Sequence, residues 1–288
     1  MADLSTEYLG LNLKNPLIVS SSTLVQNIDG VKEAEEAGAG AVVLRSLFEE
    51  LIRDASEQNP SDLYSSHPEE YDYVMSELNL QYGPRHYLDL VQTCKEKTGI
   101  PIIASINCTT PKWWINYAQQ IEAAGADAVE LNLSLMPINP YKSSEDIEND
   151  FFTIIKSARQ VLKLPIAVKI GPYFTSLSRF ANRLCGAGVQ ALVLFNRFYQ
   201  FDIDIKKMKI VGSNWYSSPR EMSLPLRWIS VLYQHVNCQL AGNTGIHEAN
   251  DVIKQILAGA QVVELASTLY MKGFSQMGRI QADLKAWM

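Results

Sequence analysis

Two cationic side chains lie at the ends of apolar runs, at positions where they could bind or stabilise a reacting ligand. Lys169 closes the run IAVKI, and Arg45 closes AVVLRS. A lysine is rarely buried without a partner, so a lysine in such a run indicates a site. Two cations in one pocket would stabilise a ligand that gains negative charge as it reacts. For Arg45 taken alone, a salt bridge with Glu49 or Glu50 explains the residue equally well.

Two turns near the C-terminal end of the chain are suited to holding a phosphate. AGNTGI (residues 241–246) and ELASTL (residues 264–269) each end an apolar run and open a helix. Backbone N–H groups and the positive end of a helix would face an anion there, and the second turn adds two hydroxyls. The alternative is that both turns only cap their helices. A phosphate combined with the two cations fits a phosphorylated cofactor such as a flavin, whose reduced ring is anionic.

Polar residues recur at one kind of position, the C-terminal ends of the apolar runs. They are Ser20 to Ser22, Arg45, Asn107, Asn132 with Ser134, Lys169, Asn196, Asn243 with Thr244, and Ser267 with Thr268. Any one of them is equally well explained by a strand end that meets solvent. The set as a whole, with its lysine, its arginine and several carboxamides, predicts one shared site.

The elements that must position these side chains repeat along the chain. AEEAGAGAVVLRS, IEAAGADAVELNLS, LCGAGVQALVLFN and ILAGAQVVELAS each indicate a helix end, a glycine C-cap and a strand that is apolar up to its end. Strands buried on both faces indicate a parallel sheet covered by helices. NPLIVSSS, PIIASINC, PIAVKIGPY and CQLAGNTG bring the total to about eight strand-helix units. We therefore predict a single (β/α)8 barrel domain over residues 1–288, with strand ends facing one mouth. A doubly wound open sheet is the alternative, but no G-x-G-x-x-G follows the first strand.

Three segments fall outside this repeat. TEYLGLNLKNP, near the N-terminus, predicts a small hairpin around Gly10 that plugs the barrel floor. Residues 47–86 form a long connection rich in acidic and aromatic residues, which predicts a lid or an interface. Residues 197–224 contain FDIDIKKMKIV, whose alternation predicts a second hairpin.

Composition excludes several classes of protein. The formal net charge of -6 and the pI near 5.3 argue against nucleic-acid binding, which depends on clustered cations. The sequence holds no apolar run near the roughly 18 residues that a membrane helix needs, and no leader pattern, so we expect a cytoplasmic protein that binds no membrane. Cys94, Cys108, Cys185 and Cys238 lie far apart without a C-x-x-C pair, which predicts buried thiols and neither a metal site nor a disulfide framework.

These segments resemble the dihydroorotate dehydrogenase family, and most of all its class 1 members. The resemblance is carried by NPLIVSSS, GAVVLRS, ELNLS followed by PIN, AVKIGPY, LFN, AGNTGI and ELASTLYMKG, from about Asn15 onward. It implies an FMN-binding barrel that oxidises a dihydropyrimidine-type CH–CH bond, with hydride passing to flavin N5 and a base removing the neighbouring proton. It also implies a pyrimidine-like small-molecule substrate, a homodimer and, for some members, an electron-transfer partner protein.

The resemblance and the strand-end pattern together give a set of candidate site residues. We assign to FMN binding Ser20, Ser21, Arg45, Asn107, Asn132, Lys169, Ser218, Gly242, Asn243, Thr244, Gly245, Ser267 and Thr268. Asn132, Asn139 and Asn196 are assigned to the substrate, and Lys169 and Arg45 to catalysis.

The chain departs from the family pattern at the position of the catalytic base. Where the family has a cysteine or serine this chain has Leu135, which cannot accept a proton. Arg45 stands where the family has a lysine, and its planar donor fork makes this a substantial change. Cys108, Tyr141 and Lys142 are weak candidates for a replacement base. The hypothesis that best fits Leu135 is a relative that binds FMN but acts on another substrate, or only poorly on dihydroorotate.

Two other functions are compatible with the same residues. A flavin-free lyase would use Lys169 to form a Schiff base and the phosphate turns to hold a phosphorylated substrate. A non-catalytic flavin-binding paralogue, or a subunit that passes electrons to a partner, would explain Leu135.

Overall fold

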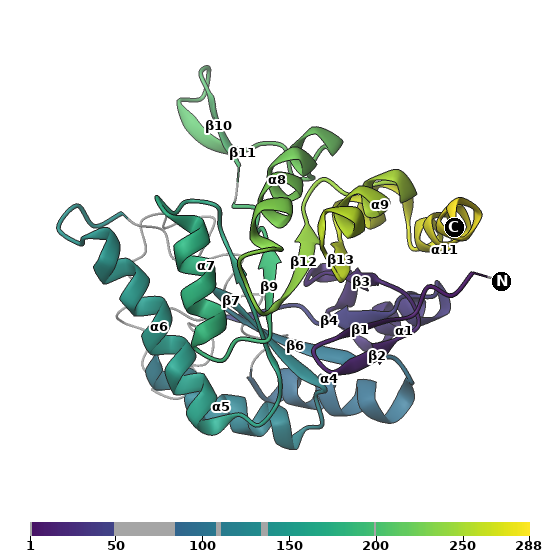
Figure 1. The fold of residues 1–288 in the computed structure, drawn as a ribbon, viewed down its shortest axis with the longest axis horizontal. Helices are drawn as coiled ribbons and strands as arrows, with labels where there is room; N and C mark the ends of the chain where they lie inside the picture. Colours follow the sequence, from purple (N-terminus) through teal and green to yellow (C-terminus); the bar gives the residue numbers. More distant parts are fainter. Residues whose placement is uncertain (1, 49–83, 108–110, 134–137, 199) are drawn as a thin grey trace.

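The computed structural model describes residues 2–48, 84–107, 111–133, 138–198 and 200–288, with residues 111–116 described at the level of the backbone. Parallel strands close into an eight-stranded barrel surrounded by helices (Figure 1). In ring order the strands are β3 (Leu17–Val19), β4 (Ala41–Val43), β6 (Ile102–Asn107), β7 (Ala128–Leu133), β8 (Ile166–Ile170), β9 (Ala191–Leu194), β12 (Gln239–Asn243) and β13 (Val262–Leu265). The β13–β3 and β4–β6 pairings complete the ring, and a short strand, β5 (Leu47–Phe48), adds to β6. The prediction of a (β/α)8 barrel is confirmed.

Amphipathic helices cover the outside of the barrel. They are α1 (Ile28–Glu36), α4 (Pro84–Lys97), α5 (Pro111–Ala123), α6 (Ser144–Val161), α7 (Leu177–Gly186), α8 (Ser223–Leu232), α9 (Ala249–Ala258), α10 (Ser267–Lys272) and α11 (Ser275–Trp287), with short 3-10 turns η1 (Thr23–Val25) and η2 (Pro219–Met222). In α7 the buried residues Leu177, Phe180, Ala181 and Leu184 recur at the spacing of one helix face. Each of the four repeated links contains a left-handed glycine, as the C-cap pattern predicts.

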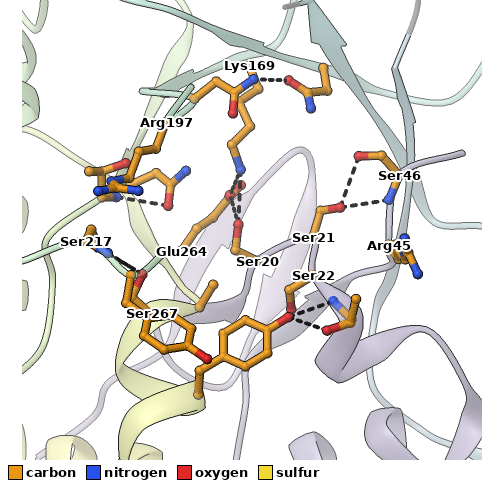
Figure 2. A pocket seen from close by; sticks show the side chains of 18 of the residues that line it. Ser20, Ser21, Ser22, Arg45, Ser46, Lys169, Arg197, Ser217, Glu264 and Ser267 are labelled. Carbon is orange, nitrogen blue, oxygen red and sulfur yellow. Dashed lines mark hydrogen bonds and ion pairs between the residues drawn. The ribbon is translucent and has the colours of Figure 1, made fainter. Parts of the chain in front are cut away.

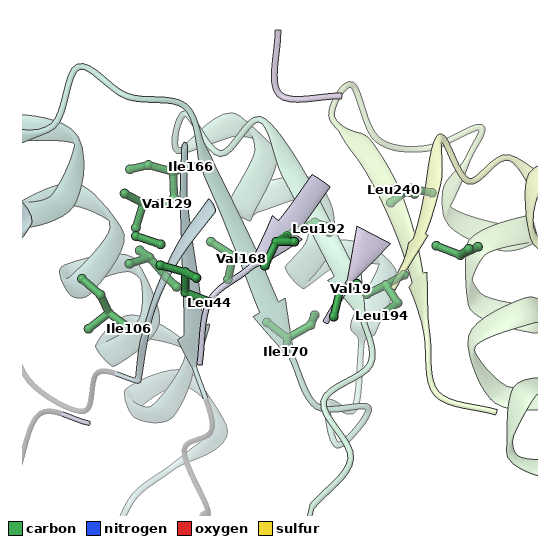
Figure 3. Packing of buried hydrophobic residues seen from close by; sticks show 14 of the residues in the cluster. Val19, Leu44, Ile106, Val129, Ile166, Val168, Ile170, Leu192, Leu194 and Leu240 are labelled. Atoms are coloured by element: carbon green, nitrogen blue, oxygen red, sulfur yellow. The ribbon is translucent and has the colours of Figure 1, made fainter. Parts of the chain in front are cut away.

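The strand side chains alternate between two hydrophobic clusters. In β8 the side chains of Ile166, Val168 and Ile170 pack outward in the larger cluster, which joins the strands to the helices (Figure 3). Ala167, between them, belongs to a smaller cluster inside the barrel. Because alternate residues of a strand point to opposite faces, Lys169 also points inward. This alternation decides which polar residues reach the interior.

The N-terminal hairpin closes the floor of the barrel. Strands β1 (Thr6–Tyr8) and β2 (Leu11–Leu13) pair antiparallel around Gly10, which has a φ of +73°. Tyr8, Leu9 and Leu13 pack inside the barrel against small side chains such as Ala167. Gln239, at the start of β12, accepts a hydrogen bond from Leu9 N at 2.7 Å, which fixes the hairpin at the N-terminal ends of the strands. The predicted hairpin and its location are confirmed.

A second hairpin stands out from the opposite end. Strands β10 (Phe201–Asp204) and β11 (Lys209–Gly212) pair antiparallel with Ile203 opposite Ile210, which confirms the hairpin predicted within residues 197–224 (Figure 1). Phe201, Ile203 and Ile210 are exposed on it. The other long connection, residues 47–86, lies mostly outside the described residues.

One expectation about the cysteines is wrong. Cys185 at the end of α7 and Cys238 before β12 form a disulfide with a Cα–Cα distance of 5.6 Å, and both residues are only partly buried. The pair could not be predicted from their 53-residue separation, because spacing along the chain does not reveal that the end of α7 meets the segment before β12. Cys94 is a buried free thiol, as expected, and Cys108 lies outside the described residues.

Candidate active site

A cavity of about 420 Å³ opens at the C-terminal ends of the barrel strands. Ten of the predicted site residues line it: Ser20, Ser21, Arg45, Asn132, Lys169, Asn196, Asn243, Thr244, Gly245 and Ser267. Figure 2 shows the arrangement, with Lys169 reaching down to Glu264 and Ser20, and Ser217 and Ser267 to one side. The strand ends therefore converge as the repeat predicts, and the roles of the individual residues stay predictions.

Lys169 lies at the bottom of this cavity between two buried carboxyl groups that sequence reasoning missed. Its Nζ lies 2.7 Å from Glu264 Oε2 and 3.6 Å from Glu130 Oε1. Nζ also donates to Ser20 Oγ at 3.0 Å, and Ser20 donates to Glu264 Oε2 at 2.9 Å. The Ser20 hydroxyl, predicted to touch a cofactor, is thus part of a buried ionic cluster.

The three ionisable groups of this cluster have shifted pKa values. Burial raises the pKa of Glu130 well above its ordinary value, Glu264 adds to the rise, and Lys169 offsets part of it. Burial also acts to raise the pKa of Glu264, but the charge of Lys169 and the hydrogen bonds to Glu130, Lys169 and Ser20 together outweigh it, and the pKa is lowered. Burial acts to lower the pKa of Lys169, but Glu130 and Glu264 outweigh it and the pKa is raised. These directions favour an ammonium on Lys169, a carboxylate on Glu264 and a neutral carboxyl on Glu130.

Hydroxyl groups form the wall of the cavity beside β4 and β6. The Ser21 and Ser46 hydroxyls lie 3.0 Å apart, and Ser46 Oγ lies 2.8 Å from Ser105 Oγ, which is buried inside the barrel. Ser46 N donates to Ser21 Oγ at 2.8 Å. Arg45 donates from Nη1 to Gln26 Oε1 at 2.8 Å, so its guanidinium is held at the edge of this wall. The alternative partners Glu49 and Glu50 lie outside the described residues.

Backbone N–H groups and hydroxyls gather at the opposite end, between β12 and β13. Ser217 donates to Ser267 Oγ from its backbone N at 2.9 Å and from its Oγ at 3.0 Å. Gly245 N donates to Ser217 Oγ at 3.0 Å, in a turn where Thr244 and Gly245 have φ values of +79° and +76°. A His247 ring nitrogen lies 2.8 Å from Ser217 O and braces the same turn. This end of the cavity has several hydrogen-bond donors that could bind an anion, and in this structure Ser217, Gly245 and Ser267 bond to one another.

Two asparagines come together above Lys169. Asn196 Nδ2 donates to Asn132 Oδ1 at 2.9 Å, and both side chains line the cavity. Arg197, the next residue, also lines it and pairs with Glu221, with 2.7 Å between Nε and Oε1. Arg197 was missed as a site residue because it begins an irregular insertion, where periodicity gives no direction for a side chain.

The other predicted residues do not line the cavity. Asn107 ends β6 half-buried, and Gly242 faces outward, where an added Cβ would meet Gln255 of α9. Ser218 is exposed and donates its backbone N to Glu221 Oε2, while its neighbour Ser217 lines the cavity. Thr268 is buried and donates to His247 O at 3.3 Å.

The predicted residues of the loop after β7 are exposed. Asn139 accepts a hydrogen bond from Tyr141 N, Tyr141 is 94% exposed, and Lys142 pairs with Asp150 at 2.6 Å. Cys108 and Leu135 lie outside the described residues. The described candidates for a base thus stand away from the cavity.

The cavity fits a flavin mononucleotide in size and in chemistry. Its volume of about 420 Å³ lies in the range of sites for ligands of that size. Hydroxyls and N–H groups at one end suit a phosphate, and the amides and the lysine suit a polar ring.

In the described part of the chain, the structure has no helix long and apolar enough to span a membrane.

Comparison with known proteins gives the class of this barrel. The family model for dihydroorotate dehydrogenase matches residues 3–288, so the chain belongs to the dihydroorotate dehydrogenase family of oxidoreductases. One relative is the catalytic subunit of dihydroorotate dehydrogenase B (NAD(+)) from Thermoplasma acidophilum, 27% identical over 299 residues, covering 100% of this chain and 94% of the relative. Proteins of the same name from Thermoplasma volcanium and Methanocella arvoryzae are 28% and 29% identical, covering 100% and 91% of this chain and 94% and 85% of the relatives.

Proposed function

We propose that this protein is an FMN-dependent oxidoreductase that acts on a CH–CH bond of a dihydropyrimidine-type substrate. The observation that carries the proposal is one cavity that joins Lys169 at its bottom to the donor cluster of Ser217, Gly245 and Ser267 at its end. A cation deep in a cavity and an anion site at the end of the same cavity suit a phosphorylated redox cofactor. Family membership supports the same assignment.

The residues present would hold FMN by its two polar ends. Ser217, Ser267 and the turn at Thr244 and Gly245 would bind the phosphate, exchanging their present bonds to one another for bonds to the anion. When bound, FMN would supply a hydride acceptor at its N5. Ser21 and the other wall hydroxyls would bind the polar edge of the ring.

Asn132 and Asn196 would orient the substrate. Each carboxamide has both donor and acceptor atoms, so the pair matches the alternating N–H and C=O groups of a pyrimidine ring. They already share one hydrogen bond of 2.9 Å, which fixes their facing orientation. A substrate bridging the two would lie over the cavity floor, close to where a cofactor ring would sit.

The substrate is expected to differ from that of the family enzymes, because Leu135 cannot act as a base. Lys142 is paired with Asp150, and Tyr141 points into solvent. We therefore expect low activity on dihydroorotate itself and higher activity on another dihydropyrimidine. A flavin-binding paralogue without catalysis is the alternative that Leu135 favours.

The flavin-free lyase is less well supported. A Schiff base requires a neutral amine, but burial, which would lower the pKa of Lys169, is outweighed by Glu130 and Glu264, so the pKa is raised. The ammonium is also held by Glu264 and Ser20. Borohydride trapping with a carbonyl substrate tests this alternative, and we expect no covalent adduct on Lys169.

Two partners belong to the proposal, a second copy of the chain and an electron-transfer protein. The relatives are named as catalytic subunits, which supports a separate subunit for onward electron transfer. The apolar face of the β10–β11 hairpin, with Phe201 63%, Ile203 57% and Ile210 50% exposed, is a surface suited to a homodimer. Light scattering of the wild type and Ile203→Asp tests this: we expect a dimer that the substitution dissociates, and a wild-type monomer would contradict it.

The catalytic proposal is tested by anaerobic reduction of the FMN-loaded protein. Dihydroorotate and other dihydropyrimidines are added in turn, and bleaching of the flavin absorbance is followed for the wild type and Leu135→Cys. We expect one dihydropyrimidine to bleach the flavin, and Leu135→Cys to increase the rate with dihydroorotate. High activity of the wild type on dihydroorotate, unchanged in Leu135→Cys, would overturn the proposed difference in substrate. Flavin that no dihydropyrimidine reduces would favour the non-catalytic paralogue.

A further inference from the structure

Lys169 of β8 is clamped between two groups, one from β13 and one from the residue that follows β3. Its Nζ lies 2.7 Å from Glu264 Oε2 of β13, and Ser20, just after β3, bonds to both. The lysine and glutamate side chains are 6% and 0% exposed. The three groups form a closed ring of bonds, so the ammonium has a carboxylate at contact distance in a region that water does not screen.

The charge of the cluster as a whole is close to zero. One ammonium beside two ionised carboxylates would leave a net negative charge in the barrel interior, which is unfavourable in a low dielectric. Glu130 is the group that stays neutral, because it lies 3.6 Å from Nζ and its Oε1 has no hydrogen-bond partner among the described residues. Two further titratable neighbours among the described residues are Tyr8 of the floor hairpin and Tyr87 of α4, and burial raises the pKa of both hydroxyls, so both are neutral.

An ion pair acts on a ring above it very differently from an unpaired lysine. The potential of a single charge falls as the inverse of distance, whereas the two charges of a pair largely cancel one another a few ångströms away. A ring that gains negative charge on reduction is stabilised by an unpaired ammonium. Beside a neutral pair it receives little of that stabilisation.

We propose that Glu264 is a positioning residue that neutralises Lys169 and thereby lowers the reduction potential of the flavin ring bound above it. The inference rests on the proposed function, since it takes FMN to be the occupant of the cavity. A lower potential makes the reduced ring a stronger electron donor, which suits onward transfer to a partner protein. Glu264 thus tunes the site through Lys169 without having to touch the substrate.

The test compares the FMN reduction potential of the wild type with that of Glu264→Gln. FMN binding is measured first by fluorescence quenching, and the potential then by spectroelectrochemical titration, so that no turnover is required. Glu264→Gln keeps the shape of the side chain but removes the carboxylate at contact distance from Lys169, which leaves the more distant Glu130, at 3.6 Å, as the described acidic neighbour of Nζ. We expect the equilibrium constant for reduction to rise at least tenfold, which is about 30 mV for a two-electron couple.

Three further variants separate this effect from a general disturbance of the site. Glu130→Gln replaces a neutral carboxyl with a neutral amide and is expected to leave the potential unchanged at neutral pH. Glu264→Asp restores the charge and is expected to return the potential toward the wild-type value. Glu248→Gln removes an exposed carboxylate that pairs with Lys272 away from the cavity, and is expected to have no effect.

The outcomes distinguish this inference from the proposed function. Equal reduction potentials for the wild type and Glu264→Gln would overturn the proposed role of Glu264 but not the proposed function. A rise in the reduction potential of Glu130→Gln equal to that of Glu264→Gln would do the same. A wild type that binds no FMN would overturn the proposed function, and this inference with it. If Glu264→Gln does not fold, Ser20→Ala, which removes one of the bonds that hold the pair, is expected to raise the potential by a smaller amount; no change there would count against the clamp.

Discussion

Lys169 and Glu264 lie 95 residues apart in the sequence, yet their Nζ and Oε2 atoms meet at 2.7 Å inside the barrel. The strands that carry them, β8 and β13, are separated in the ring by β9 and β12. The two side chains therefore reach across the interior rather than along one wall. This ion pair sets the charge of the cavity floor.

Removing the lysine of the Lys169–Glu264 pair is expected to destabilise the protein strongly. Lys169→Met leaves Glu264 buried without its cation, and we expect a loss of about 3–5 kcal/mol in the free energy of unfolding. Lys142→Met is the matched control, because Lys142 pairs with Asp150 at the surface, where both side chains are more than 40% exposed. We expect that control to cost less than about 1 kcal/mol. Urea denaturation measures both, and similar losses for the two variants would contradict the buried cluster.

Glu130 should make the protein less stable as the pH rises. Burial raises its pKa in the folded state above the ordinary value of 4.5, so above that pH the unfolded chain loses the proton while the folded protein keeps it. Because the unfolded state then binds fewer protons, stability falls through this window. Glu264 acts the other way, and only below pH 4.5, because its folded pKa is lowered by Lys169 despite its burial.

Glu130→Gln should therefore flatten the dependence of stability on pH. Urea denaturation at intervals from about pH 5 to about pH 9 compares the slopes of the wild type and the variant. Glu248→Gln is the control, since hydrogen bonding to Lys272 lowers the pKa of Glu248 and confines its contribution to lower pH. A variant slope equal to that of the wild type would show that Glu130 is not held neutral.

For two buried tyrosines, loss of the hydroxyl group is expected to change the stability of the protein in different directions. Tyr8 Oη has no hydrogen-bond partner among the described residues, so Tyr8→Phe is expected to be neutral or to stabilise by about 1 kcal/mol. Tyr87 Oη donates to Ser105 O at 3.0 Å and accepts from Ser105 N at 2.7 Å, so Tyr87→Phe is expected to destabilise by about 1–3 kcal/mol. Thermal unfolding of both variants measures the contrast, and equal shifts would contradict it.

Gly245 is expected to be necessary for both folding and cofactor binding. It has a φ of +76°, and an added Cβ would run into the backbone of Met222 and Ser218. Gly273 has a nearly equal φ of +75° with nothing within 4 Å of the added Cβ, so Gly273→Ala carries a backbone cost of about 1–3 kcal/mol without a steric clash. Gly245→Ala should cost more and should weaken FMN binding by about tenfold or more. Fluorescence titration checks this, and equal FMN affinities for the two variants would exclude the turn from the binding site.

Much of the fold could be predicted because the barrel strands are short, mostly apolar runs, four of which follow a glycine that ends a helix. The same logic placed Lys169 and Asn132 at the mouth, since strand ends of a parallel barrel share one face. Alternation along β12 also explains the one strand glycine that was misplaced: Asn243 points inward, so its neighbour Gly242 must point outward.

The rest of the site depended on information that periodicity does not carry. Ser217 rather than Ser218 lines the cavity, because the register of an irregular loop is set by contacts such as the bond to Ser267. Glu130 and Glu264 were missed, although a carboxylate within an apolar run is the same kind of signal that identified Lys169. Which of these side chains pair across the interior depends on barrel closure, which brings together strands far apart in the sequence.

The most direct test of the account is the visible spectrum of the purified protein, followed by titration with FMN. We expect either bound flavin as purified or saturable uptake of FMN that Gly245→Ala weakens and Gly273→Ala does not. A colourless protein that takes up no FMN would contradict the cofactor assignment and would favour the flavin-free lyase function instead.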